Sequence, residues 1–367
     1  MRRSLPRSGT SPQLLLLGSI SVHGIWSDDL SRQPARHCRL FVRQHRSPLP
    51  DGVSGPIRRS TLADANEQWD WRIYAQLAQT LIRKARRLYA NEPLAADLDA
   101  TAYALDSTTI DLCLNLFRWA QFRRTKGAIK LHTLLDLLGP IPTFIYISDG
   151  KLHDVNALDL IPIEAGSFYI MDRGYLDFER LHTFQDLGAF FITRAKRSFK
   201  YVRLLSQEVN LSTGVRSDQI IRLKIFHSQK GYPDRLRRVR YFDDETQRFF
   251  VYLTNNFTLP PMSIALLYKS WWQVELFFKW IKPHLRIKAF YGTSENAVKS
   301  QIWIAVSMYV LIAIVRKRLG LDMSLYQILQ ILSVTPFEKM PILQALETFN
   351  AQIDLTSDCN QLNLFDF

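Results

Sequence analysis

The succession of short apolar runs between residues 102 and 197 is the feature that most restricts how this chain can fold. The runs have the length and the β-branched and aromatic content of strands, and short helical segments separate the later ones. In chain order the sequence predicts strands at 102–112, 127–137 and 142–150, a short helix at 154–160, a strand at 166–175, a helix at 177–187 and a strand at 189–197. Three strands in a meander, followed by helix–strand–helix–strand, predict a mixed α/β fold.

Other helical and β-rich segments flank this succession. An amphipathic helix is predicted at 69–91, and its basic run at 83–87 either is solvated or tracks phosphates. Residues 198–258 alternate polar and β-branched side chains between turn signals, which predicts a β-rich insertion. The apolar stretch 302–315 within a predicted helix at 295–319 is shorter than the roughly 20 residues that span a bilayer, so we expect a buried core helix and no membrane partner.

The charge of the chain indicates what it binds. Its 367 residues include 47 Lys and Arg against 34 Asp and Glu, a formal net charge of +13. Such an excess favours a polyanionic partner, with nucleic acid ahead of an acidic membrane surface. The cysteines Cys38, Cys113 and Cys359 are isolated in the sequence. They provide neither a disulfide framework nor a CxxC zinc site, and they fit a reducing, cytoplasmic compartment.

Residues 1–57 differ in composition from the rest of the chain, because they contain arginine but no lysine and are rich in Ser and Pro. The start resembles a signal peptide, with a basic opening before a short apolar run at Leu14–Leu17. The downstream sequence nevertheless favours a cytoplasmic protein. A change this abrupt also arises when a reading frame slips upstream of an intact one, and that alternative stays open.

Two acids occupy positions where the sequence otherwise predicts burial. Asp106 lies inside the run at 102–112, and Asp172 lies near the end of the run at 166–175. A carboxylate in an apolar strand is costly unless it is hydrogen-bonded, paired or bound to a cation. Each acid alone is also explained as a turn or strand-end residue, so the interpretation depends on a partner.

The predicted helix at 268–282 provides a third acid, Glu275. At 3.6 residues per turn, one face carries Tyr268, Trp271, Glu275, Lys279 and Lys282, and the neighbouring apolar stripe carries Val274, Phe277, Ile281 and Leu285. Docked by that stripe, the helix would bring Glu275 to the two strand acids at one sheet edge. A set of carboxylate oxygens suits Mg²⁺ or Mn²⁺ rather than zinc. Two such ions about 4 Å apart can activate a nucleophile and stabilise the leaving oxygen of a phosphodiester.

Several segments, in this order and spacing, resemble the DDE transposases of bacterial insertion sequences, in the insertion sequence 4 family. They are LDSTTIDL, RRTKGAIKLHTLLDL, ISDGKLHDVNALDL, YIMDRGYLDFERL, FFITRAK, YKSWWQVELFFKWIK and the closing QLNLFDF. The resemblance runs from about Arg58 to the C-terminus. It implies a ribonuclease H-like core with a β-rich insertion before the last acid, in which Asp106, Asp172 and Glu275 bind two Mg²⁺ or Mn²⁺ ions. It also implies a homodimer that cuts DNA at terminal inverted repeats and joins the 3′-hydroxyl to target DNA.

The family's signature on the last helix is Tyr-(2)-Arg-(3)-Glu-(6)-Lys. Tyr268, Glu275 and Lys282 match it, and Lys279 matches a further basic position. Trp271 stands where the signature has an Arg that contacts the DNA backbone near the cut. Tryptophan has neither the charge nor the bidentate donors of that residue. The resemblance therefore implies DNA contacts by Tyr268, Lys279 and Lys282, and a departure at Trp271.

Other residues are further candidates for DNA binding. By its position, Trp272 resembles the family's aromatic residue that holds distorted bases at the transposon end, where stacking contributes about 1–3 kcal/mol per base. His153 lies in a turn between the first two acids and either approaches the metals or scissile phosphate or caps the turn. Lys126 and Lys130 are candidate phosphate contacts, together with Arg123 and Arg124, although a basic hairpin is often only solvated. Asp111 and Asp136 are interpreted as structural.

These observations predict a segmented chain. The segments are an atypical N-terminal stretch at 1–57, a helical DNA-contacting segment at 58–100, the first part of the catalytic core at 101–197, the β-rich insertion at 198–258, the core helices with Glu275 at 259–320 and a C-terminal helical segment at 321–367. The predicted function is DNA transposition by two-metal phosphoryl transfer, in the bacterial cytoplasm near the nucleoid. Two alternatives stay open: a catalytically impaired relic that only binds DNA, favoured by Trp271 and by the lack of a family-like helical domain at 1–57, and a ribonuclease H-like nuclease with another role.

Overall fold

The computed structural model describes residues 64, 66–94, 98–284, 290 and 292–334. The chain forms two compact units, one of residues 1–81 and 281–367 and the other of residues 82–280. The second unit holds the sheet and all three predicted catalytic acids. The atypical stretch at 1–57, Leu285 of the apolar stripe and the closing QLNLFDF lie outside the described residues.

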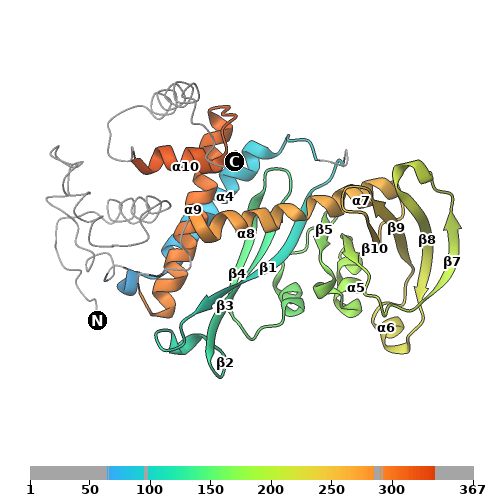
Figure 1. The fold of residues 1–367 in the computed structure, drawn as a ribbon, viewed down its shortest axis with the longest axis horizontal. Coiled ribbons are helices and arrows are strands. Elements are labelled where there is room, and N and C mark those ends of the chain that lie inside the picture. Colours follow the sequence, from blue (N-terminus) through green and yellow to red (C-terminus); the bar gives the residue numbers. More distant parts are fainter. Residues whose placement is uncertain (1–63, 65, 95–97, 285–289, 291, 335–367) are drawn as a thin grey trace, which may run out of the picture. The chain divides into compact units, whose positions relative to one another are not determined.

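The strands of the second unit form one mixed sheet (Figure 1), with the order β2-β3-β1-β5-β6-β10-β9-β8-β7 and with β4 also paired to β3. The strands are β1 (Ala102–Leu112), β2 (Gln121–Arg123), β3 (Lys126–Asp136), β4 (Ile141–Asp149), β5 (Phe168–Met171), β6 (Phe190–Arg194), β7 (Tyr201–Gln207), β8 (Val215–Leu223), β9 (Leu236–Asp243) and β10 (Arg248–Thr254). β1, β3 and β4 are antiparallel, whereas β1, β5 and β6 are parallel. The predicted mixed α/β fold is confirmed.

Short helices connect the parallel strands. The 3₁₀ helix η2 (Asp154–Leu160) follows β4, and the helix α5 (Phe178–Asp186) connects β5 to β6. Asp177 caps α5 by accepting a hydrogen bond from the Arg180 N–H, and the sequence predicts this helix to within a residue. The sequence does not predict β2 or the 3₁₀ helix η1 (Arg118–Ala120) before it.

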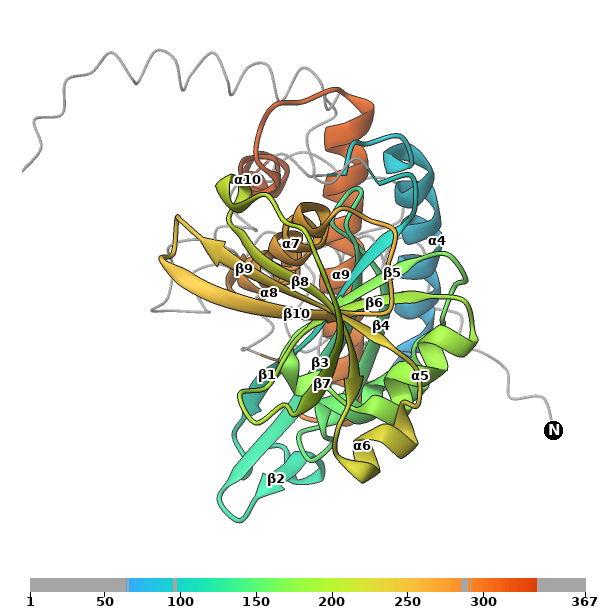
Figure 2. The same ribbon diagram turned by 90° about the vertical axis from the view of Figure 1, so that its right-hand side faces the viewer.

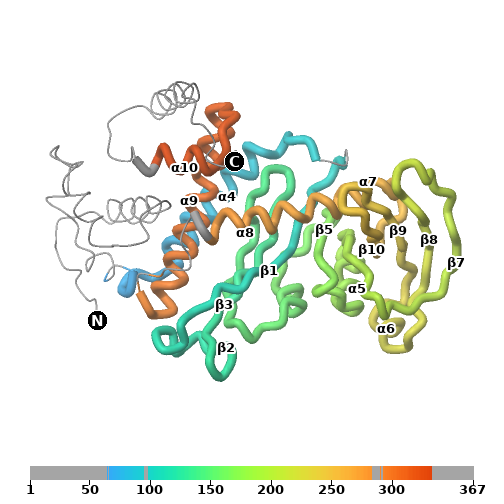
Figure 3. The backbone as a smooth tube through the Cα atoms, in the orientation of Figure 1, coloured from blue at the N-terminus to red at the C-terminus, as the bar shows by residue number. Residues whose placement is uncertain are grey.

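Residues between β6 and the helix α7 (Pro261–Ser270) form four antiparallel strands, β7 to β10 (Figure 3). β10 pairs antiparallel with β6, so these strands extend the central sheet rather than forming a separate one. The turn signal at 212–214 appears as the 3₁₀ helix η4 (Leu211–Thr213) followed by Gly214 with φ +85°, a conformation that favours glycine. A short helix, α6 (Phe226–Gly231), was not predicted from the sequence.

The predicted helix at 268–282 is two helices, α7 and α8 (Trp272–His284), which meet at Trp271. This is a correction with a local cause. The Trp271 N–H donates to the Tyr268 carbonyl and the Val274 N–H to the Trp271 carbonyl, both three residues apart, so the helical phase changes at the junction. Tyr268 therefore does not share one continuous helical face with Glu275 and Lys279.

The core of the second unit lies against one face of β1, β3, β5 and β6. Tyr103, Leu105, Tyr169 and Met171 are almost completely buried there, together with residues of η2 and α5. Tyr169 packs edge-on against Phe184 of α5, with ring centroids 5.0 Å apart. Aromatic rings of this size contribute much of the apolar area that stabilises the layer.

The first unit contains the N-terminal part of α4 (Arg72–Tyr89), α9 (Glu295–Arg318) and α10 (Leu325–Val334). Ser294 caps α9 by accepting from the Ala297 N–H, and the Asn296 side chain bonds the backbone of Trp71 and Trp69. Among the described residues, α9 alone is long and apolar enough to cross a membrane, but 83% of its most apolar window is buried within the protein. It has the burial expected of a core helix.

Candidate active site

Asp106 and Asp172 follow paired positions on neighbouring strands. β1 and β5 run parallel with Leu105 beside Met171, so the next residue on each chain is one of the two acids. Asp172 caps the short 3₁₀ helix η3 (Arg173–Tyr175) and accepts a hydrogen bond from the Gly174 N–H. Asp172 therefore lies at the end of β5, next to the part of β1 that carries Asp106.

Glu275 lies in the first turn of α8, and Trp271 ties the start of this helix to β1. Trp271 Nε1 donates a hydrogen bond of 2.9 Å to the carbonyl oxygen of Leu105, one residue before Asp106. Val274 and Phe277 are buried, as the predicted apolar stripe requires, and Glu275 stays half-buried. Three carboxylates thus come from β1, from the end of β5 and from α8.

The pKa of Asp106 depends on these neighbours. Burial, followed by the negative charges of Asp172, Glu275 and Asp154, raises the pKa of Asp106 to about 7. None of the ion pairs within the described part of the chain involves Asp106, Asp172 or Glu275. The site therefore has an excess of negative charge that a bound cation would relieve.

The chemistry of these side chains fits a divalent cation, because all their ligand atoms are carboxylate oxygens. In the structure, however, no three His, Cys, Asp or Glu side chains among the described residues form a group that could hold one ion. Shared binding of an ion by Asp106, Asp172 and Glu275 therefore requires their side chains to move together. Their role as metal ligands stays a prediction.

Asp154 is a fourth acid near the site. It is held by a small polar network that includes Ser107, whose side chain lies on the face of β1 opposite to that of Asp106. Its Oδ1 accepts hydrogen bonds from the Ser107 hydroxyl at 2.7 Å and from Lys130 Nζ at 3.0 Å, and Lys130 also bonds the Leu152 carbonyl. Burial alone would raise the pKa of Asp154, but these two donors hold it below its usual range. Lys130, predicted to contact phosphate, is engaged within the protein. Sequence reasoning missed Ser107, although it follows Asp106 directly.

His132 lies beside this network and is fully buried. Burial lowers the pKa of His132 to about 4, and its Nε2 lies 2.9 Å from the Ser148 hydroxyl. It is therefore a neutral imidazole that stabilises the pairing of β3 with β4, rather than a proton donor at neutral pH.

One residue of the basic run at 83–87, Arg86, and the acid Asp136 have a structural use. Arg86 Nε bonds Asp136 at 3.1 Å, and Arg86 Nη2 bonds the Tyr103 hydroxyl, which donates to Glu164. Arg86 is thus not a freely solvated residue, and Asp136 has the structural role expected from the sequence.

Tyr268 is buried, with only 7% of its surface exposed. Its ring lies 4.8 Å from that of Tyr252 and 6.1 Å from that of Trp271, and burial raises the pKa of its hydroxyl. In this conformation Tyr268 packs the C-terminal end of α7 against Tyr252 of β10. Its predicted contact with DNA stays a prediction and would require this packing to open.

Trp272 and Lys279 of α8 are exposed, unlike Tyr268. Trp272 is 50% exposed, and Lys279 Nζ lies 5.2 Å from the centroid of its ring, within the range of a cation–π contact. Both are therefore accessible to a large anionic ligand. Lys282, further along α8, is half-buried and has interactions within the protein.

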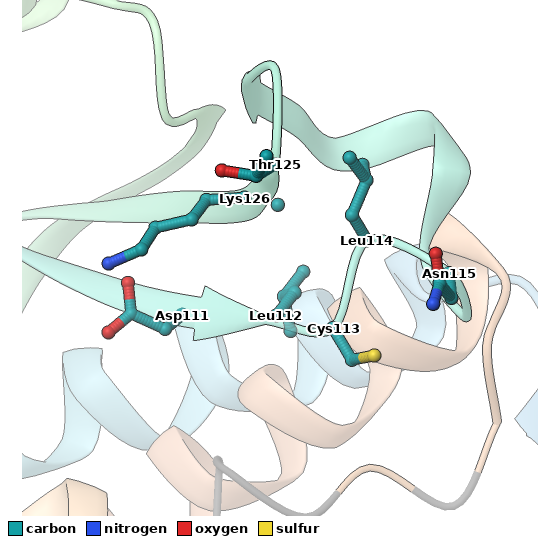
Figure 4. A pocket seen from close by; sticks show the side chains of 8 residues that line it. Asp111, Leu112, Cys113, Leu114, Asn115, Thr125 and Lys126 are labelled. Carbon is teal, nitrogen blue, oxygen red and sulfur yellow. The ribbon is translucent and has the colours of Figure 1, made fainter.

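The remaining basic candidates lie at the turn between β2 and β3. Lys126 is exposed, as are Arg123 and Arg124. Lys126 borders a hollow of about 280 Å³ lined by Asp111, Leu112, Cys113, Leu114, Asn115, Thr125, Lys126 and Gly127, in which the Lys126 and Asp111 side chains point toward each other (Figure 4). His153 is exposed at the N-cap position of η2, but its side chain makes no capping hydrogen bond there.

The Transposase DDE domain family matches residues 97–311, a range that includes Asp106, Asp172 and Glu275. The chain belongs to this family. It is a DNA transposase, an enzyme that cuts and joins DNA, of the kind that insertion sequences encode. The Transposase DDE domain covers all the strands of the sheet, the helices α7 and α8 and the greater part of α9.

Three named transposases are similar to this chain. A putative transposase, y4zB, of Sinorhizobium fredii is 31% identical over 320 residues, which cover 84% of each chain. The probable transposase for insertion sequence element IS5377 of Geobacillus stearothermophilus is 30% identical over 212 residues, 57% of this transposase and 55% of that one. The putative transposase for element IS4SA of Synechocystis is 24% identical over 264 residues, 69% and 70% of the two chains.

A solved structure also resembles this transposase. The piggyBac transposase, in a synaptic complex with hairpin DNA, aligns with a TM-score of 0.47 at 10% identity, over 98% of this chain and 79% of that one.

Proposed function

We propose that this transposase cuts the ends of an insertion sequence and joins the freed 3′-hydroxyl to target DNA, with Asp106, Asp172 and Glu275 as its catalytic acids. The observation that carries the proposal is the placement of the three acids: Asp106 and Asp172 follow the paired residues Leu105 and Met171 of β1 and β5, and Glu275 lies on the helix whose start is bonded to β1. Burial, and then the negative charges of Asp172 and Glu275, raise the pKa of Asp106 to about 7. Such an arrangement of acids, in a basic chain, suits a cationic cofactor and an anionic substrate.

Two Mg²⁺ or Mn²⁺ ions are the cofactors that we propose. When bound, such ions lower the pKa of an attacking water or hydroxyl and stabilise the charge on the leaving oxygen. The chain's own contribution is to hold the acids on three rigid elements and to orient them through the Trp271–Leu105 bond and the Asp172–Gly174 cap. Lys279 and Trp272 stay available on α8 for the phosphate backbone and for a base near the cut.

The finer classification that we propose is the insertion sequence 4 family with a ribonuclease H-like core. It is supported by the four strands β7 to β10, which are inserted between β6 and α7, before Glu275. Tyr268, Glu275, Lys279 and Lys282 follow the family's signature, and Trp271 replaces its Arg. We further propose a homodimer that pairs two terminal inverted repeats, acting in the cytoplasm near the nucleoid.

The decisive experiment is cleavage of DNA that carries the element's own terminal repeats, with and without Mg²⁺. The parent protein should cut only with the ion, and Asp172→Asn should abolish cutting while DNA binding is kept. If Asp172→Asn cut as fast as its parent, the assignment of the three acids would be wrong. The Trp271→Arg variant is measured in parallel, because a guanidinium keeps an N–H donor for Leu105 and restores the signature charge.

A second candidate function is a catalytically impaired relic that binds DNA without cutting it. Trp271 favours this alternative, because the signature Arg is missing at the position next to α8. The relic predicts no Mg²⁺-dependent cleavage by the parent, with DNA affinity kept. Cleavage by Trp271→Arg alone would identify Trp271 as the cause of the impairment, and cleavage by the parent would exclude the relic.

A further inference from the structure

One face of the inserted strands β8, β9 and β10 carries arginines that lie over aromatic rings. The register pairs Phe242 with Phe249 and Arg240 with Val251, so these side chains share a face. The Arg240 guanidinium carbon lies 4.4 Å from the Phe249 ring centroid, and that of Arg216 lies 5.5 Å from the Phe242 centroid. The two rings are 4.8 Å apart, so the arginines flank one aromatic pair.

A third arginine continues this surface. Arg238 is two residues before Arg240 on β9, and its guanidinium carbon lies 5.0 Å from the Tyr201 ring centroid on β7. Arg238 Nη1 also bonds the Gln219 side chain at 3.1 Å. Burial lowers the pKa of Arg238, and the charge of Arg240 lowers it further, which indicates two neighbouring cations. We call Arg216, Arg238, Arg240, Tyr201, Phe242 and Phe249 the arginine face.

The acids of these strands lie on the opposite face. Asp218 is paired in register with Val239 and forms a buried ion pair with Arg237, and Asp243 lies 3.9 Å from Lys269 of α7. Figure 2 shows α7 on one side of β8 to β10 and the helices α5 and α6 on the other. Among the described residues of β7 to β10, no Asp or Glu side chain lies on the arginine face.

The arginine face is accessible at its end near the 243–248 turn. Arg216 and Arg240 are exposed, and Phe249 has 54% of its surface exposed. At the other end Ile221 and Leu253 belong to the hydrophobic core, so α5 and α6 cover only part of this face. A large ligand can therefore reach the two outer arginines without any rearrangement of the core.

The contacts indicate which part of a nucleic acid this surface fits. A guanidinium already occupies a face of each ring, so the rings are not open platforms for stacking single-stranded bases. The rings instead hold the guanidiniums in place. Arg216 Nη1 donates one long hydrogen bond of 3.5 Å to the Leu211 carbonyl, and because Arg216 and Arg240 are exposed, further guanidinium donors can reach phosphate oxygens. Ser217 and Gln219, the partners of Arg240 and Arg238 on β8, have neutral side chains.

We propose that the arginine face binds the sugar–phosphate backbone of duplex DNA without regard to sequence, outside the carboxylate site. The inference rests on the proposed function for the identity of the polyanion. Each arginine that neutralises a phosphate releases counterions, so the contribution is measurable as a salt dependence of affinity. Arg216 and Arg240, the two exposed members, are the residues to test.

The experiment compares the full chain with the variant Arg216→Gln/Arg240→Gln in binding to a random-sequence duplex by fluorescence anisotropy at several salt concentrations. Two lost phosphate contacts should reduce the slope of log affinity against log salt by about 1.8. The affinity loss between 50 and 200 mM salt should then be about tenfold smaller than for the parent. Arg216→Lys/Arg240→Lys, which keeps both charges, should keep the parental slope.

The matched control is Arg222→Gln/Arg248→Gln, which removes the same charge from exposed residues of β8 and β10 on the opposite face. The DNA-binding role of the arginine face would be contradicted by an unchanged salt slope in Arg216→Gln/Arg240→Gln, or by an equal change of slope in the control. The assay uses no cleavage, so it is independent of the catalytic proposal. If the parent cleaves terminal repeats but Arg216→Gln/Arg240→Gln keeps the parental salt slope, the proposed function is retained and the DNA-binding role of the arginine face is rejected.

Discussion

Trp271 Nε1 and the Leu105 carbonyl oxygen are 2.9 Å apart, and this hydrogen bond joins the helix of one predicted catalytic acid to the strand of another. Trp271 precedes Glu275 by one helical turn, and Leu105 precedes Asp106 by one residue. The ring of Trp271 is stacked near that of Tyr268, with centroids 6.1 Å apart, which fixes the orientation of the indole. We therefore infer that Trp271 is a positioning residue, and its N–H donor occupies the position at which the proposed signature has an Arg.

Replacement of Trp271 by Phe keeps the aromatic packing and removes the Nε1 donor. A hydrogen bond of this kind contributes about 0.5–1.5 kcal/mol, so we expect kcat for strand cleavage to fall up to about tenfold while KM for DNA stays near the parental value. Single-turnover cleavage at saturating DNA measures this effect. Trp272→Phe, the same exchange one residue later, should alter DNA affinity rather than kcat. An unchanged kcat for Trp271→Phe would remove its positioning role.

The sequence predicts the strands well because their apolar runs alternate with clear turn residues. The run around Asp106 lies in β1 with the predicted bounds, 102–112, and the parallel β1–β5 pair brings Asp106 beside Asp172, as expected of acids on neighbouring strands. The strand bounds depend on local patterns that a single sequence carries. The three acids lie on the expected elements, and their joint role as one site stays a prediction.

The sequence could not predict features that depend on tertiary contacts. Tyr268 looks like a residue of an exposed helix face, but it is buried against Tyr252 of β10. Lys130 looks like a solvated hairpin cation, but Asp154 forms an ion pair with it. Neither partner is a neighbour in sequence, so periodicity carries no signal for these contacts.

Replacement of Gly174 by Ala should displace the Asp172 carboxylate. A Cβ at position 174 would lie 2.7 Å from Asp172 Oδ1, closer than side-chain carbons normally approach an oxygen, so Asp172 must rotate and lose its cap. We expect Mg²⁺-dependent cleavage to fall at least about tenfold, because a misplaced catalytic group of this kind costs up to about 10²-fold. DNA binding and the thermal unfolding midpoint should change little. Cleavage at the parental rate would mean that the cap is dispensable.

The raised pKa of Asp106 predicts a pH dependence of stability in metal-free protein. Its native pKa of about 7 lies above the ordinary 3.8, so the native state binds this proton more tightly than the unfolded state. The stability contribution of the protonated carboxyl is therefore present at low pH and is lost as pH rises from about 4 to about 7. Urea unfolding in EDTA at pH 5 and pH 8 should show a larger loss for the parent than for Asp106→Asn.

Added Mg²⁺ provides the complementary measurement at pH 8. The ion should raise the free energy of unfolding of the parent, because it binds carboxylates that repel one another only in the native state. Asp172→Asn, which removes one of those charges, should gain less from the same concentration. Equal gains in both proteins would place the bound ion elsewhere.

The ion pair of Arg237 with Asp218 supports the inserted strands from within. Both side chains are 2% exposed, the guanidinium bonds both carboxylate oxygens at 2.9 and 2.7 Å, and Arg237 Nη1 also bonds the Leu259 carbonyl before α7. Arg237→Met should lower the free energy of unfolding by about 3–5 kcal/mol, because it leaves the Asp218 charge buried without a partner. Arg237→Met/Asp218→Leu, which removes both charges, should recover much of that loss in denaturant titrations. A single variant as stable as the parent, or a double variant less stable than the single one, would contradict this account, since apolar replacement of both members of a buried pair is often nearly neutral.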